Sequence, residues 1–428
     1  MAKRKKEKMV RLNEDYDDLE GMYVPESWVP KLDDLGNGFM AKGSRLERYR
    51  GNDKEVVIPE GITEVKEGAF SDKSVVSVTI PKSLTKIRGD AFKFCSSLVK
   101  FVVAEDHPKF SVAGNCLIDT ENKTVVIGLK SSVIPDDGSV TKIAEHAFRG
   151  RGWGRESNVI PETITEIGDH AFAGCGLIEL TIPSSVKKIG RDAFGACDYL
   201  KTVVIEEGLT EISESAFAGN EYLRSVKLPE SVTVIAKEAF YECENLEEIN
   251  FPANLKEIGY RAFLWSNNWY RGIGGHLFIN KNLKIDFSSF PRDGIESITV
   301  EEGNPYYYSK DNCLIEKGSE TLIMGCKNSV IPSTVKKIGK LAFYFCNGLK
   351  EIVIPDTIEA IEDEAFEFCG ELERIVIPDS VNEIGNKAFW CRREFWFPLN
   401  LKSVTMPKRF ADRKDIFDTL DGVKVTLI

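Results

Sequence analysis

The sequence contains no run of about 18 consecutive apolar residues, and it therefore predicts no transmembrane helix. The basic residues 1–11 are not followed by the apolar stretch of a secretory signal peptide, which favours a cytoplasmic location. Positive charge is in deficit, because 56 Lys and Arg stand against 67 Asp and Glu, and 56 − 67 = −11. Nucleic acid selects basic surfaces, so no nucleic-acid partner is expected.

Residues that usually carry chemistry are also scarce. The ten Cys among 428 residues are too dilute for a disulfide scaffold, and none forms the C-x₂-C pair of a zinc site. No G-x-S-x-G, H-E-x-x-H or P-loop motif is present, and the glycines at 272–275 lack the Lys-Ser/Thr of a phosphate loop. We therefore predict no catalytic residue, no metal and no cofactor. An enzyme with a site on the irregular segment 264–310 remains the alternative.

The sequence does contain an internal repeat. The pair Ala-Phe occurs eleven times, and within uninterrupted runs the copies are 22 to 24 residues apart. Each copy ends a pattern such as IPSSVKKIGRDAFGAC (182–197), and a second pattern, L-x-x-I-x-I-P, commonly follows, as in Leu223–Pro229. Such regular self-similarity predicts a stack of identical short units. The Ala residues of the eleven pairs are at 69, 91, 147, 171, 193, 216, 239, 262, 342, 365 and 388.

Each unit has a simple physical interpretation. The alternation in L-x-x-I-x-I predicts a strand in which Val226 and Leu228 face inward while Ser225 and Lys227 face outward. The pattern V-x-x-I-G predicts a second short strand, with Gly permitting a tight corner. The A-F-x-x-C segment is expected to form one helical or 3₁₀ turn. A unit this short cannot bury its apolar face alone, so the chain is predicted to be a β-rich, right-handed stack of coils.

The repeat consensus I-P-x-x-V-x-x-I-G-x-x-A-F-x-x-C-x-x-L-x-x-I-x-I-P resembles the BspA-like (type 5) leucine-rich repeat family. The resemblance covers about residues 48–428. It implies a leucine-rich-repeat solenoid that acts by binding, in a family that is mostly bacterial or protist and often located at the cell surface. The missing signal peptide favours the cytoplasm instead, so the compartment stays open.

Two longer modules interrupt the repeat and align with each other at an offset of 197 residues. They span about 101–135 and 298–332, and Asn115-Cys116-Leu117-Ile118 matches Asn312-Cys313-Leu314-Ile315. Each contains two apolar segments around a polar turn, which predicts a β-hairpin island. Terminal repeats of a solenoid must shield its core. The predicted organisation is therefore a tail and cap (1–47), a solenoid (48–428) with an irregular segment (264–297), and a C-terminal cap (408–428).

Two sets of residues within the repeat suggest chemistry but favour structural roles. Six Cys lie four residues after the Ala of Ala-Phe, a position that Asn220 fills in another repeat, which predicts a buried thiol ladder without disulfides. His146 and His170 directly precede Ala-Phe on successive coils and are expected about 5 Å apart. Varied residues occur there in other repeats, so a solvated turn position is expected rather than a metal pair.

Two candidate binding surfaces remain. The outward positions of the L-x-x-I-x-I strands are mixed, small and polar, and stacking aligns them as one ribbon suited to a protein or glycan. We predict a non-catalytic, monomeric scaffold for protein–protein interaction, with a carbohydrate-binding adhesin as the alternative. The ribbon candidates are Glu179, Thr202, Ser225, Lys227, Glu248, Asn250, Glu351 and Arg374. The adhesin would use an aromatic patch of Trp265, Trp269 and Tyr270.

Overall fold

The computed structural model divides the chain into two compact units, Met1–Pro108 and Lys109–Ile428. No helix among the described residues is long and apolar enough to cross a bilayer. The structure describes residues 9–11, 23–25, 32–71, 74–93, 95–150, 152–154, 159–264, 275–286, 290, 292, 295–391, 400–413, 415–417 and 422–428.

The first unit consists of short strands in three sheets. Two of these sheets contain parallel strands from neighbouring coils. In one, β5 pairs with β7; in the other, β8 lies between β6 and β9 and pairs with both. One 3₁₀ helix, Gly89–Phe92, covers the second Ala-Phe pair. The strands are β1 (Met9–Arg11), β2 (Tyr23–Pro25), β3 (Asp33–Asp34), β4 (Phe39–Lys42), β5 (Arg45–Tyr49), β6 (Glu55–Val57), β7 (Glu64–Val65), β8 (Ser77–Ile80) and β9 (Lys100–Val103).

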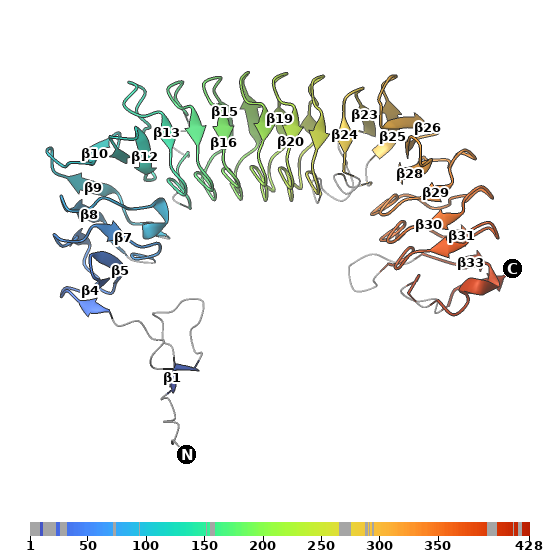
Figure 1. Cartoon of the computed structure of the whole chain (residues 1–428), viewed down its shortest axis with the longest axis horizontal. Coiled ribbons are helices and arrows are strands. Elements are labelled where there is room, and N and C mark those ends of the chain that lie inside the picture. Colours follow the sequence, from blue (N-terminus) through green and yellow to red (C-terminus); the bar gives the residue numbers. More distant parts are fainter. Residues whose placement is uncertain are drawn as a thin grey trace, which may run out of the picture. The chain divides into compact units, whose positions relative to one another are not determined.

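In the second unit each central coil contributes one strand to a sheet of L-x-x-I-x-I segments and one to a sheet of V-x-x-I segments, and Figure 1 shows this arrangement. The L-x-x-I-x-I segments form the sheet β15 (Glu179–Ile182), β17 (Thr202–Ile205), β19 (Ser225–Lys227) and β21 (Glu248–Ile249). The V-x-x-I segments belong to two further sheets. The first continues from the first hairpin island through β13 (Lys142–Ile143), β14 (Glu166–Ile167) and β16 (Lys188–Ile189). The second consists of β18 (Glu211–Ile212), β20 (Val234–Ile235), β22 (Glu257–Ile258) and β24 (Lys284–Ile285).

The same plan continues after the second island. The strands β29 (Lys337–Ile338), β30 (Ala360–Ile361) and β32 (Glu383–Ile384) extend one sheet. The strands β31 (Arg374–Val376), β33 (Ser403–Met406) and β34 (Lys424–Leu427) form another, followed along the chain from β33 by the 3₁₀ helix Lys408–Phe410. Because β34 pairs in register with β33, the segment expected as a C-terminal cap contains one more coil strand.

Both hairpin islands are confirmed, and each has one more strand than expected. In the first, β10 (Phe110–Ala113), β11 (Cys116–Asp119) and β12 (Thr124–Ile127) pair antiparallel, and β12 then pairs parallel with β13. In the second, β26 (Tyr307–Lys310), β27 (Cys313–Glu316) and β28 (Thr321–Met324) do the same before β29. The strands β3, β4 and β5 repeat this order before β7. The described residues therefore contain three such hairpins, one ahead of each run of coils.

A column of stacked Phe rings forms the centre of the core. In the second unit the rings of Phe194, Phe217 and Phe240 are almost parallel, with neighbouring centroids 5.4 Å apart. Phe290, in the segment expected to be irregular, continues the column at 5.2 Å from Phe263. The described part of that segment therefore contributes a strand, β24, and a core Phe to the solenoid without an Ala-Phe pair.

The Ala-Phe segments form turns, and within the described part of the chain the expected helical turn is found only as the 3₁₀ helix in the first unit. The reason is that the residue before Ala adopts a left-handed conformation in most coils, with φ of +52° at His170 and +53° at Arg261. The glycine of the V-x-x-I-G pattern has another role than the expected corner. A Cβ on Gly190 would lie 2.4 Å from the backbone nitrogen of Asp169, so Gly there permits close contact between coils.

The Cys position is both buried and hydrogen-bonded. The Cys197 thiol donates to the carbonyl of Phe172 (3.2 Å) and that of Cys243 to Phe217 (3.1 Å). Asn220 replaces the thiol with an amide that donates to Phe194 O at 2.9 Å. All ten Cys are buried and none is in a disulfide. The predicted thiol ladder is confirmed.

We expect these thiols to be unreactive in the folded protein. Burial raises the pKa of Cys197 and of Cys243 to about 12, so almost no thiolate is present at pH 8. Titration with a thiol-specific disulfide reagent should give rapid reaction of ten Cys in denaturant and a rate at least a hundredfold lower without it. Rapid native reaction of more than one thiol would contradict this prediction.

Candidate functional site

The strand face is the set of outward side chains on the L-x-x-I-x-I sheets. The pairing Glu179↔Thr202, Thr202↔Ser225 and Ser225↔Glu248 places these four residues in one column across four coils. In the last coils Glu351 pairs with Arg374 through an isolated bridge. The alignment expected from the repeat is therefore present in both groups of coils.

Exposure differs along the strand face. Lys227, Glu248 and Arg374 are exposed, whereas Thr202 and Ser225 are half-buried between their neighbours. The Ser225 hydroxyl lies 3.4 Å from a Glu248 carboxylate oxygen and donates to it. The charged members therefore offer most of the polar surface available to a partner.

Asn250 lies at an outward position, but its amide is engaged within the protein. Its Oδ1 accepts from the backbone N–H of Leu228 and its Nδ2 donates to Leu228 O, both at 2.8 Å. The side chain thus extends the backbone ladder by one residue beyond β21. Sequence periodicity places Asn250 on this face but says nothing about its hydrogen bonds.

Exposed aliphatic side chains also occupy the position directly before several Ile-Pro pairs. Val353 is 80% exposed and Val330 65%, both directly before an Ile-Pro pair. Val133 and Val159 occupy the equivalent position near the start of the second unit and are exposed as well. Alternation within L-x-x-I-x-I predicts an outward side chain at this position, and the exposure of Val353 confirms it.

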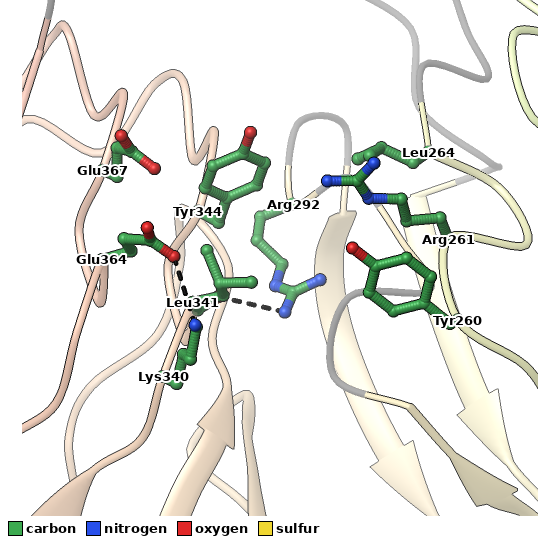
Figure 2. A pocket seen from close by; sticks show the side chains of 9 residues that line it. All are labelled: Tyr260, Arg261, Leu264, Arg292, Lys340, Leu341, Tyr344, Glu364 and Glu367. Carbon is green, nitrogen blue, oxygen red and sulfur yellow. Dashed lines mark hydrogen bonds and ion pairs between the residues drawn. The ribbon is translucent and has the colours of Figure 1, made fainter. Parts of the chain in front are cut away.

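The predicted aromatic patch lies outside the described residues, because Trp265, Trp269 and Tyr270 fall in 265–274. A cavity of about 370 Å³ lies beside the residue that precedes them, Leu264. Figure 2 shows its lining. Three turns line the cavity. The turn after β22 contributes Tyr260, Arg261 and Leu264, the turn after β29 contributes Lys340, Leu341 and Tyr344, and the turn after β30 contributes Glu364 and Glu367. Arg292 lies between these groups.

Arg292 is a buried cation that joins two runs of coils. It follows Phe290, which belongs to one hydrophobic cluster, while Ala342 belongs to the next. Its guanidinium donates to the carbonyls of Leu341 (3.0 Å), Ala342 (3.4 Å) and Phe290. Burial lowers its pKa to about 10, which still leaves it charged at neutral pH.

The other charged groups of the cavity have different surroundings. Lys340 forms an ion pair with Glu364 at 3.6 Å. The Arg261 guanidinium lies over the Tyr260 ring, 4.9 Å from its centroid. Burial, and next the negative charge of Glu367, raise the pKa of Tyr344 to about 12, so its hydroxyl stays protonated.

His146 and His170 stack as expected, with ring centroids 4.9 Å apart. His170 Nδ1 lies 2.7 Å from an Asp192 carboxylate oxygen, on the next coil. His146 is buried, so the expected solvated position is wrong for this residue, because the neighbouring coil covers its ring. Among the described residues, no group of three or more His, Cys, Asp or Glu is arranged to hold a metal ion.

A family model for the BspA type leucine rich repeat region matches residues 49–151, 141–269 and 323–414. The chain belongs to the BspA-type leucine-rich repeat family. The matched ranges include all eleven Ala-Phe pairs. Arg292 and most of the second island lie in the unmatched interval 270–322. The resemblance seen in the repeat consensus is thus confirmed, and the BspA-type solenoid is the scaffold on which any site is built.

Several solved structures of leucine-rich repeat proteins are similar to this BspA-type chain. A leucine-rich repeat protein from Bacteroides ovatus is 22% identical, with 94% of this chain and 99% of that chain covered and a TM-score of 0.49. One from Eubacterium ventriosum is 22% identical (59% and 73% covered, TM-score 0.44). A leucine rich cell surface protein from Faecalibacterium prausnitzii is 20% identical (94% and 95% covered, TM-score 0.39). No curated protein matches.

Proposed function

We propose that this chain is a non-catalytic repeat scaffold that binds another protein through the strand face. The supporting observation is the register of the parallel strands, which aligns the same outward positions on neighbouring coils. Side chains presented by a hydrogen-bonded sheet are already ordered, so binding costs little conformational entropy. Many individually weak contacts then add along the sheet.

The composition of the strand face favours a protein partner. Val353, 80% exposed, follows Glu351 by two residues, and Glu351 pairs with Arg374 on the next coil. Protein interfaces combine apolar contacts with charged residues, and Arg is among their enriched residues. Lys227 supplies a second exposed cation on the earlier coils.

A charge-reversal series tests the strand face. The double change Lys227→Glu and Arg374→Glu is expected to weaken binding of a partner protein at least tenfold, because two attractive contacts become repulsive. The partner would be isolated with the unmodified chain and its dissociation constant measured by biolayer interferometry. Lys256→Glu is the matched control, since Lys256 is exposed but belongs to the V-x-x-I side of its coil.

The control separates a local effect from a general one. Equal loss with Lys256→Glu would assign the effect to net charge, and unchanged binding by the double variant would place the interface elsewhere. Asn250 is left out of the series, because changing it would disturb the backbone bonds of Leu228.

A further inference from the structure

The cavity beside Arg292 concentrates positive charge in an acidic protein. Three cations, Arg261, Arg292 and Lys340, and two carboxylates, Glu364 and Glu367, line it, and 3 − 2 = +1. The whole chain carries −11. Tyr260 and Tyr344 lie on opposite sides of Arg292, as Figure 2 shows, so aromatic rings accompany the charges on both walls.

Only one of the three cations lacks an internal anionic or carbonyl partner. Arg292 donates to backbone carbonyls, and Lys340 pairs with Glu364. Arg261 is exposed and contacts the Tyr260 ring, and it forms no ion pair with any carboxylate of the described chain. A guanidinium in this position can bind a ligand carboxylate with two parallel hydrogen bonds.

We propose that this cavity binds a sugar residue that carries a carboxylate, such as a uronic or sialic acid. Arg261 binds the carboxylate, the rings of Tyr260 and Tyr344 pack against the C–H faces of the sugar, and Glu364 and Glu367 accept its hydroxyls. The site is separate from the strand face, and its proposal does not depend on a protein partner.

Size and charge favour this ligand class over others. A volume of about 370 Å³ is at the lower end of small-molecule sites, which suits one sugar residue rather than a large cofactor. A phosphate carries up to about two negative charges, and Glu364 and Glu367 would repel it more strongly than a single carboxylate.

Isothermal titration calorimetry of the full chain tests the proposal with matched ligands. Methyl β-D-glucuronide and methyl β-D-glucoside have the same sugar ring, but the first carries a carboxylate where the second carries a hydroxymethyl group. The methyl glycoside of N-acetylneuraminic acid is the second acidic probe. We expect at least one acidic probe to bind at least tenfold more tightly than the glucoside. The proposal is overturned if neither acidic probe binds at a 10-fold excess over protein at millimolar concentration. It is also overturned if the glucoside binds as tightly as the acidic probes.

The variant Arg261→Gln should remove the preference for the acidic sugar. Lys387→Gln is the matched control, because Lys387 is also the left-handed residue before Ala-Phe (φ +55° against +53°) and also lies over an aromatic ring, that of Trp390. We expect the control to bind as the unmodified chain does. An unchanged preference in Arg261→Gln would refute the role of Arg261.

Two further measurements keep the result interpretable. Tyr260→Leu, at a 41% exposed position, should weaken binding of the acidic sugar while keeping the thermal unfolding midpoint. N-acetylglycine tests a carboxylate without a sugar ring. If it binds as tightly as the glucuronide, the cavity recognises a peptide-type carboxylate and the sugar proposal is wrong.

Discussion

The variant Arg292→Ala is expected to lose on the order of 3–5 kcal/mol of unfolding free energy. The change removes the donors to the carbonyls of Leu341, Ala342 and Phe290 and leaves a cavity where a fully buried side chain was. Urea unfolding followed by circular dichroism measures the loss. Arg191→Ala is the control, because Arg191 is exposed and its contact with Glu214 is long (3.7 Å), so about 0.5 kcal/mol or less is expected.

The shape of the unfolding curve gives a second readout. Arg292 donates hydrogen bonds to residues in or beside both hydrophobic clusters. In a repeat protein each coil is stabilised mainly by its neighbours, so this residue links the stability of the two runs of coils. Without it, the coils before and after this point should unfold in two transitions. A single transition at the original midpoint would show that other contacts hold the two runs together.

The second large effect is expected at the centre of the Phe column. Phe217 is fully buried and its ring stacks on Phe194 and Phe240, each 5.4 Å away. Phe217→Ala should cost about 3–5 kcal/mol, since the neighbouring coils are fixed by their strand pairing and cannot close the gap. Urea unfolding again measures the change.

A control in the same coil isolates the effect of burial. Tyr222 is 54% exposed, so Tyr222→Ala should change stability by about 0.5 kcal/mol or less. Phe217→Leu should fall between the two variants, because it keeps most of the apolar volume but loses the ring stacking. Equal losses for Phe217→Ala and Tyr222→Ala would show that the Phe column does not hold the coils together.

Several features followed from the sequence because they involve contacts one repeat apart. The thiol of Cys243 meets the carbonyl of Phe217, 26 residues earlier, and Ser225 pairs with Glu248, 23 residues later. When the same contact recurs at every coil, the residue types that make it also recur, and their spacing is visible in the chain. The repeat fold, the strand register and the thiol ladder belong to this class.

The features that break the period were decided by the tertiary structure. Arg292 bonds Leu341 and Ala342 across 49 and 50 residues, a contact made once in the chain and therefore without a repeating signal. The cavity likewise combines turns from three separate coils. Periodicity assigns each residue a position within its coil, but it cannot say which turns meet where the regular stacking stops.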